Sequence, residues 1–284
     1  MYSSNDNTIP NPQNALRMVV YISEDMVNWS EPKVAFEYIP TDLTKIKAEL
    51  WATEVHFYKG KYYAFMSFRN HTEKRGTYIA VSDKPDGKFV LMSDSPLTPL
   101  ENSCIDGTLY LENDIPYIVY SLDWPYHYVP QKKAYVGEIW ARELSKDLSK
   151  GIGKPFKLFS SDDCPISRAT PHHMIYNDEK IVRYGSDAPF LIRLSNNQLM
   201  ITWSPYLQNN YVVLGAISKS GSIKDHWEHL AEPIFDDNGG HAMFFKDYDG
   251  TMKMCIHQPE KGSLERMLCL TIEEKDGIIS AIYK

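Results

Sequence analysis

Short apolar runs separated by polar turns dominate the chain, and long stretches with helical spacing of apolar residues are hard to find. The runs are rich in Tyr, Ile, Val and Phe, which are typical of β-strands. In one recurring pattern an apolar or aromatic residue precedes a polar turn, and a strand then rises toward a Ser or an aromatic residue. Its four copies occupy residues 57–67, 111–121, 194–204 and 248–257. Each copy is predicted to be a hairpin closed by a tight turn.

A second pattern follows each of these hairpins: a strand ending in Ser, an acidic or polar turn, and then an aromatic residue. Its copies lie at residues 19–29, 78–89, 139–147 and 214–227, and a further outer hairpin is expected around residues 267–272. Two alternating hairpins make a four-stranded unit, and units repeating every ~40–60 residues are typical of propeller blades. The pattern predicts an all-β, five-bladed β-propeller. A β-sandwich with coincidental turn spacing is the alternative.

The first predicted blade is incomplete. Outer hairpins indicate five blades, whereas inner hairpins account for only four. The inner hairpin of the first blade should precede Val19, but the residues there are rich in Asn and Pro and are predicted to be loop.

Composition limits the class of protein. With 284 residues and 43% apolar residues, the chain can form one domain over residues 1–284, and disordered or collagen-like classes are excluded. Lys and Arg number 30 and Asp and Glu 37, a net charge of −7, which argues against nucleic acid as a partner. No apolar run reaches the ~20 residues that span a bilayer, so no membrane partner is expected. Nothing in the composition predicts the oligomeric state.

The N-terminus and the cysteines indicate a cytoplasmic setting for the chain as written. Residues 1–6 lack the basic start and apolar segment of a secretion signal, although a missing N-terminus could hide one. No cysteine pair has metal-binding or C-x-x-C spacing. We therefore expect the cysteines to be buried small hydrophobes in a reduced setting. They are Cys104, Cys164, Cys255 and Cys269.

Candidate chemistry lies at the starts of the inner strands, because these strands converge on the axis of a propeller. In the second blade Glu54 and His56 alternate on one strand face, and Trp51 offers a flat apolar ring of the kind that stacks on a sugar. In the third and fourth blades Asp106 and Asp187 stand among apolar or small residues. Each of these residues also has an ordinary structural interpretation. Trp51 could belong to the core, Glu54 could be solvated, and the two aspartates could be turn residues.

The remaining candidates line the same predicted cavity. His241 follows two glycines at the start of the fifth inner strand, although a lone His is more often structural. Asp123, Trp124 and Trp203 stand at the far ends of inner strands, and Glu138 lies on the strand that follows in the third blade. The two tryptophans could equally belong to the core between blades. A long polar insertion between blades, residues 162–180, is expected to cover the pocket.

The ordered motifs of this chain resemble family 43 glycoside hydrolases. They are Trp-Ala-x-Glu-Val-His, Tyr-x-Gly-x-Tyr-Tyr, Ile-Asp-Gly, Asp-Ala-Pro-Phe-Leu and Gly-Gly-His, interleaved with Ser-x-Asp-x-x-x-Trp. Each motif alone is weak, but their order and spacing match the family from about Val19 to Ile272.

The resemblance implies a five-bladed propeller and an inverting hydrolase of arabinofuranosyl, xylosyl or related bonds. The general acid falls on Asp187, in D-A-P where the family usually has E-G-P, and the carboxylate that orients it and tunes its pKa falls on Asp106. The axial His, which in some members helps to hold a metal or a water, falls on His241, and calcium is the candidate ion. No cofactor is required. Trp51, Glu54 and His56 fall on the pocket-lining strand.

The third carboxylate of the family, the general base, belongs to an Asp-Pro motif in the first blade, and it is not present in this chain. Since inversion needs a carboxylate opposite the acid to activate water, we expect an impaired enzyme with a largely intact sugar pocket. The expected partner is a neutral oligosaccharide or polysaccharide. The competing interpretation is a non-catalytic carbohydrate-binding propeller. Related fructan-hydrolase and sialidase propellers fit less well, because their motifs are missing or one residue out of register.

Overall fold

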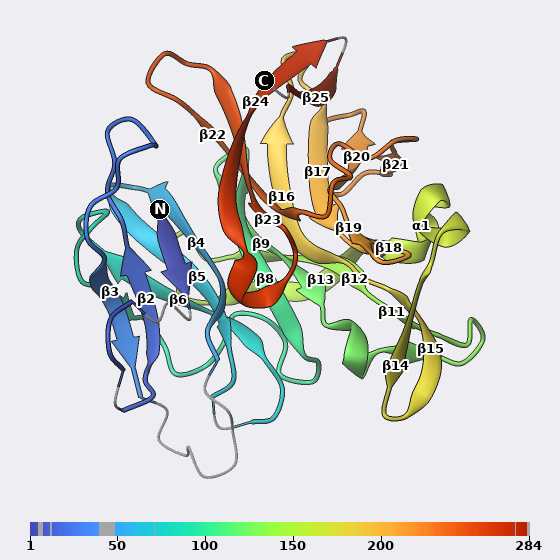
Figure 1. Cartoon of the computed structure of the whole chain (residues 1–284), viewed down its shortest axis with the longest axis horizontal. Helices are drawn as coiled ribbons and strands as arrows, with labels where there is room; N and C mark the ends of the chain where they lie inside the picture. Colours follow the sequence, from blue (N-terminus) through green and yellow to red (C-terminus); the bar gives the residue numbers. More distant parts are fainter. Residues whose placement is uncertain (5–7, 12, 40–48, 71, 276, 283–284) are drawn as a thin grey trace. The chain divides into compact units, whose positions relative to one another are not determined.

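Strands account for nearly all regular structure in this protein. The computed structural model describes residues 1–4, 8–11, 13–39, 49–70, 72–275 and 277–282 (Figure 1). Within these ranges the helical segments are one α-helix, α1 (Pro165–Ala169), and three short 3₁₀ turns, η1 (Trp124–Tyr126), η2 (Ser161–Asp163) and η3 (Gly262–Leu264). None of the described helices is long and apolar enough to cross a membrane. The all-β prediction is confirmed.

The described residues form two compact units. Unit 1 comprises residues 1–109, 115–118 and 142–153, and unit 2 comprises residues 110–114, 119–141 and 154–284.

Unit 1 contains two antiparallel sheets. The first has the order β1-β2-β3 (Tyr2–Ser4, Leu16–Val20 and Lys33–Tyr38). The second has the order β4-β5-β6-β7 (Trp51–Tyr58, Lys61–Phe68, Gly76–Ser82 and Val90–Leu91). Alternate side chains from both sheets, among them Met18, Phe36, Met66 and Phe68, bury a common core. The first sheet has three described strands, one fewer than the second, in agreement with the prediction of an incomplete first blade.

A third sheet has the order β13-β12-β9-β8, and its strands are divided between the units. Their bounds are β8 (Cys104–Glu112), β9 (Ile115–Leu122), β12 (Glu138–Leu144) and β13 (Gly151–Ser160). The β8–β9 turn places Asn113 and Asp114 at φ values of 50° and 61°. Asn and Asp tolerate this left-handed conformation, and two such residues in succession match the twist of a hairpin.

Unit 2 contains two more four-stranded antiparallel sheets. One has the order β16-β17-β20-β21 (Asp187–Arg193, Leu199–Ser204, Leu214–Ser218 and Glu228–His229). The other has the order β22-β23-β24-β25 (Gly240–Lys246, Met252–Gln258, Arg266–Lys275 and Ile278–Ile282) and is drawn in orange and red in Figure 1. Residues of both sheets share one core, in which Met200, Phe235 and Met254 are buried. The four inner hairpins therefore lie where the first pattern predicts them.

Two of the four cysteines form a disulfide, although all four were expected to be reduced. Cys255 and Cys269 are directly opposite each other on β23 and β24 and form a disulfide, with their Cα atoms 4.3 Å apart. Cys104 and Cys164 are buried and are not in a disulfide, as predicted. The expectation failed for the first pair because their proximity is set by strand register and not by sequence spacing. Disulfides persist in oxidising environments, so cysteine usage no longer supports a reduced setting.

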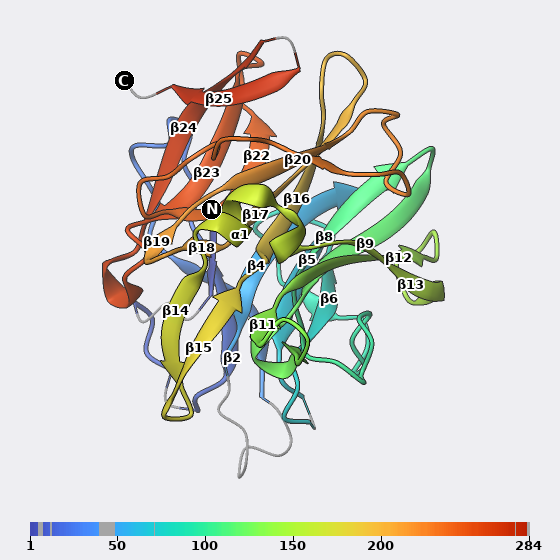
Figure 2. The ribbon, with the colours of Figure 1, turned by 90° about the vertical axis from the view of Figure 1, so that its right-hand side faces the viewer.

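The predicted polar insertion contains regular secondary structure. Residues 162–180 contain η2, α1 and strand β14 (His172–Tyr176), which pairs with β15 (Glu179–Tyr184). These strands join β10 (Tyr128–Val129) and β11 (Ala134–Val136) in a sheet of order β10-β11-β15-β14, here called the inserted sheet (Figure 2). The β11–β15 pair is parallel. A short separate hairpin joins β18 (Tyr206–Leu207) to β19 (Asn210–Tyr211).

Candidate functional site

Four inner strands share a backbone irregularity near their starts. Ala52, Asp106, Ala188 and His241 all have left-handed φ values, between 48° and 59°. The pairing register shifts at three of these points, after Trp51, Asp187 and Gly240. Such bulges re-aim side chains, and left-handed φ at residues other than glycine clusters at functional sites. Asp106 and His241 are thus the left-handed residues of their strands, and Asp187 directly precedes the left-handed residue of its strand.

Buried serines hold these bulges in place. The hydroxyl of Ser67 on β5 accepts a hydrogen bond from the backbone N–H of Asp106 at 2.8 Å. The hydroxyl of Ser204 on β17 does the same for His241 at 2.9 Å. The hydroxyl of a third serine, Ser121 on β9, lies 2.7 Å from the hydroxyl of Ser186, the residue before Asp187. These serines are the residues toward which the predicted strands rise, but the sequence did not reveal their role.

Asp106 is buried within β8 and is not a turn residue. Its neighbour Gly107 donates its N–H to the hydroxyl of Thr77 at 3.2 Å. A Cβ at position 107 would stand 2.6 Å from the Thr77 side chain, so only glycine fits there. The Asp-Gly pair thus reflects close backbone packing that fixes the position of the carboxylate.

Trp51 is supported from one side and open on the other. The Arg75 guanidinium carbon lies 3.3 Å from the centroid of the Trp51 ring, and Arg75 itself is buried. Arg75 is held in turn by the carboxylate of Glu49. With 38% of its surface exposed, Trp51 keeps a face available for stacking.

Glu54 and His56 form a pair, and a neighbouring strand completes it. His56 Nε2 lies 2.9 Å from Glu54 Oε2 and 3.3 Å from the hydroxyl of Thr108. Thr108 is two residues beyond Asp106 on β8 and was not singled out in the sequence. Unit 1 therefore brings the pair on β4 together with the strand that carries Asp106.

In unit 2 the Asp187 carboxylate stands at the start of β16 beside a buried guanidinium. Arg183 Nη2 lies 3.4 Å from Asp187 Oδ2. The same guanidinium lies over two rings, 4.4 Å from the centroid of Trp124 and 5.0 Å from that of Tyr206. Arg183 Nε is buried and has no hydrogen-bond partner among the described residues. A cation in this position stabilises the ionised form of a carboxylate.

A hydrogen-bonded chain continues from Tyr206. Its hydroxyl donates to Glu260 at 2.6 Å, and Glu260 also pairs with His257. Burial opposes ionisation of Glu260, but the hydrogen bonds from His257 and Tyr206 outweigh it and lower its pKa. The His257 ring stacks on Tyr211, with centroids 5.5 Å apart, and lies 6.1 Å from the ring of His241.

One group of side chains among the described residues has the spacing to hold a metal. Among the described residues, ligand atoms of His257, Glu260 and Glu265 lie within 4.8 Å of one another, and His241 is not part of this group. His257 and Glu260 already bind each other, and Tyr206 binds Glu260, so this arrangement is held together by protein contacts. A metal at His241 stays a prediction.

Four further candidates differ in how accessible they are. Trp124 lies beneath Arg183, and Asp123 is buried just before it. Glu138 is buried and accepts hydrogen bonds from Trp140, Lys157 and Ser160, so its carboxylate is engaged by the protein itself. Trp203 is fully buried and packs on Phe159 and His229, with centroids 4.8 and 5.2 Å away. Trp203 therefore belongs to the core, the alternative interpretation of this residue, because no face of its ring is open to a sugar.

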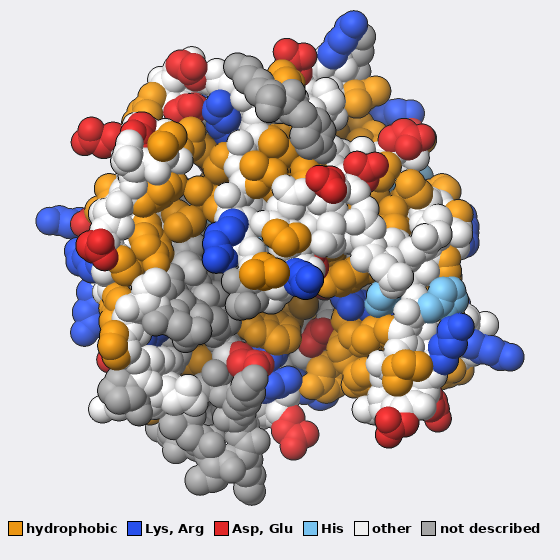
Figure 3. Space-filling view, in the orientation of Figure 1, with side chains coloured by type: hydrophobic (Ala, Val, Ile, Leu, Met, Phe, Trp, Pro, Cys, Tyr) orange, Lys and Arg blue, Asp and Glu red, His pale blue; other side chains and the backbone are white. Residues whose placement is uncertain are grey.

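Charge is distributed evenly over the visible surface. Acidic and basic side chains are interspersed on the face shown in Figure 3, and the described residues form no large field of one sign there. A polyanion such as nucleic acid is bound through a concentrated basic field. The displayed face has no such field.

Comparisons with known proteins agree with the motifs. The sequence matches the family described as glycosyl hydrolases family 43 over residues 4–275. The structure is similar to an endo-arabinase from Bacteroides thetaiotaomicron VPI-5482, with a TM-score of 0.80, 30% identity, and 97% of this chain and 90% of that chain covered. It is similar to a thermostable family-43 glycoside hydrolase, with a TM-score of 0.74, 21% identity, and 94% and 86% coverage. It also resembles an endo-1,4-beta-xylanase from Bacteroides thetaiotaomicron VPI-5482, with a TM-score of 0.68, 17% identity, and 100% and 90% coverage. None of the curated proteins compared with the chain matches it.

Proposed function

The chain belongs to the family 43 glycosyl hydrolases, and on this premise we propose that it cleaves arabinofuranosyl- or xylosyl-containing glycans with inversion at the anomeric carbon. Its all-β fold is the five-bladed propeller of that family, with an incomplete first blade. The observation that carries the proposal is the family match over residues 4–275. The partner is a neutral oligosaccharide or polysaccharide.

Asp187 is the proposed general acid. It protonates the oxygen of the departing sugar, for which it must hold a proton when the substrate binds. Arg183 opposes this because it favours the ionised carboxylate. The carboxylate proposed to orient the acid and tune its pKa is Asp106, the residue on which the family's third-blade carboxylate falls. Trp51, with its open ring, is proposed to stack on a sugar.

The sequence provides no match to the family's general base, because it contains no Asp-Pro pair. Turnover by the chain as written is therefore expected to be low. A carboxylate positioned to activate water is worth roughly 10²–10⁴-fold in rate.

The test is hydrolysis of nitrophenyl α-L-arabinofuranoside, nitrophenyl β-D-xyloside, linear arabinan and xylan. NMR of the first product formed reports whether the configuration is inverted. Asp187→Asn should lower any turnover by roughly 10²–10⁴-fold while sparing glycan binding. Asp106→Asn should lower the rate less and shift the pH profile. Unchanged hydrolysis by the Asp187→Asn protein would remove Asp187 from the acid role.

A non-catalytic carbohydrate-binding propeller is the second candidate. It is favoured by the missing base motif and by the support that Arg75 gives to the exposed ring of Trp51. No turnover of any of these substrates, together with saturable binding of arabinan or xylan, would select this function over the enzyme.

A further inference from the structure

The register of the inserted sheet places a set of aromatic side chains on one face. Tyr128 is opposite Tyr135, and Tyr135 is opposite Arg183. On the other side of β15, Tyr176 is opposite Glu179. Side chains of directly paired residues share a face, and so do alternate residues of one strand, such as 179, 181 and 183. One face of this sheet therefore carries three tyrosines around a central Arg.

These rings form a continuous surface, which we call the aromatic strip and define as Trp124, Tyr128, Tyr135 and Tyr176. Tyr128 and Tyr135 have centroids 5.1 Å apart, and Tyr135 and Tyr176 have centroids 5.4 Å apart. Trp124 contacts Tyr135 at 5.9 Å and Tyr176 at 5.4 Å. Tyr128 has half of its surface exposed, and the other three residues are partly exposed. The strip is thus open to a ligand rather than closed into a core.

The strip leads directly to the proposed acid. Arg183 lies over Trp124 and contacts Asp187 at 3.4 Å. A ligand lying along the rings from Tyr128 to Trp124 would therefore end beside the Asp187 carboxylate.

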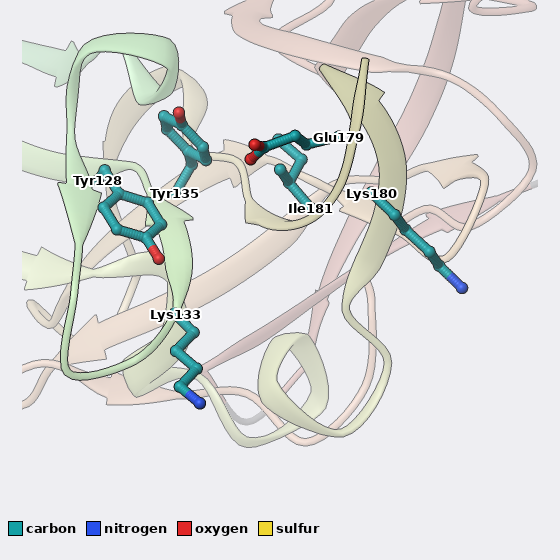
Figure 4. Close-up of a pocket in the computed structure, with 6 residues that line it drawn as sticks. All are labelled: Tyr128, Lys133, Tyr135, Glu179, Lys180 and Ile181. Atoms are coloured by element: carbon teal, nitrogen blue, oxygen red, sulfur yellow. The ribbon is translucent and has the colours of Figure 1, made fainter. Parts of the chain in front are cut away.

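A cavity marks the outer end of the strip. Its volume is about 400 Å³, and Tyr128, Tyr135, Glu179 and Ile181 are among its lining residues. Figure 4 shows the two tyrosine rings on one side of this space and the Glu179 carboxylate directed into it from the other. The ammonium groups of Lys133 and Lys180 point outward. Flat rings with a few polar groups are suited to a sugar, which presents both C–H faces and hydroxyls.

We propose that the aromatic strip binds additional sugar units of a neutral pentose polymer, so that the protein prefers long glycans to short ones. The inference rests on the proposed function, because it takes Asp187 as the point toward which the chain of sugars runs. Continuity between the strip and Asp187 favours a glycan over a second copy of this protein. The occupant is a run of several pentosyl residues.

Direct binding tests the strip separately from catalysis. Affinity electrophoresis in gels containing linear arabinan or xylan measures retardation in the Asp187→Asn background, where hydrolysis does not interfere. Tyr128→Ala should weaken binding about 5–10-fold, the contribution expected of one stacked ring. Tyr128→Phe keeps the ring and should bind like the parent. Tyr248→Ala, at a tyrosine that is 91% exposed in the β22–β23 turn, is the matched control and should also bind like the parent.

In the active protein, Tyr128→Ala should lower the ratio of kcat/KM on arabinan to kcat/KM on nitrophenyl arabinofuranoside by a similar factor. Equal binding of the polymer by Tyr128→Ala and the parent would overturn the proposal. So would a dimer, detected by light scattering, that the same substitution dissociates, because the strip would then be a contact between copies. If the aromatic strip binds polymer but neither the parent nor any variant hydrolyses it, the proposed hydrolase activity is wrong and the proposal for the aromatic strip stands.

Discussion

Asp106 and Asp187 both lie near the start of an inner strand, at or beside a left-handed residue, but they have different neighbours. At Asp106 neutral hydroxyls hold the backbone: Ser67 accepts its N–H, and Thr77 accepts the next N–H. Asp187 has the guanidinium of Arg183 beside it. The same guanidinium lies over the rings of Trp124 and Tyr206. The repeated backbone supplies the position in both cases, whereas individual side chains supply the chemistry. A cation therefore acts directly on the carboxylate at position 187, whereas the hydroxyls named at position 106 hold the backbone.

The largest effect is expected at Arg183. Arg183→Met removes the cation that favours ionised Asp187, so the acid keeps its proton to higher pH. The alkaline limb of the pH–rate profile should move to higher pH. Arg183→Lys keeps the charge and should move the limb less. An unmoved limb in Arg183→Met would show that Arg183 does not govern the ionisation of the acid.

The next effect concerns the serine that holds Asp106. Ser67→Ala leaves the buried N–H of Asp106 without its acceptor, which should cost about 1–3 kcal/mol in the free energy of unfolding. Turnover should fall while the pH profile keeps its shape, because a serine hydroxyl does not titrate in this range. Ser204→Ala removes the equivalent contact at His241 and should cost similar stability with a smaller loss of turnover. A shifted pH profile in Ser67→Ala would contradict the view that Ser67 acts only by holding the backbone of Asp106.

The smallest effect is expected at Tyr206. Tyr206→Phe removes a hydrogen bond to Glu260 and should lower the free energy of unfolding by about 1–2 kcal/mol at neutral pH. Because the pKa of Glu260 is lowered in the folded protein, this contribution is present above its unfolded value, near 4.5. It is lost as the pH falls through the folded pKa.

Urea unfolding of the parent and Tyr206→Phe across this pH range measures the difference. Tyr248→Phe, at an exposed ring, serves as the control and should match the parent throughout. A stability difference that is independent of pH would mean that the hydrogen bond to Glu260 is not its source.

The sequence by itself determined the strands, their hairpins and the two candidate carboxylates. Alternating polarity and turn residues act over a few neighbours, so the hairpin at residues 111–121 can be predicted from residues such as Asn113 and Asp114 alone. The repeat then indicates which strands are equivalent, and that placed Asp106, Asp187 and His241 near the starts of their strands.

Only the tertiary structure decided which distant residues meet. The inserted sheet depends on the parallel pairing of β11 with β15, and the disulfide depends on the register of β23 against β24. Arg183 beside Asp187, Ser67 beneath Asp106 and the burial of Trp203 all arise from such long-range contacts. No periodicity encodes them, because a local pattern fixes the face on which a side chain lies but not the strand that packs against it.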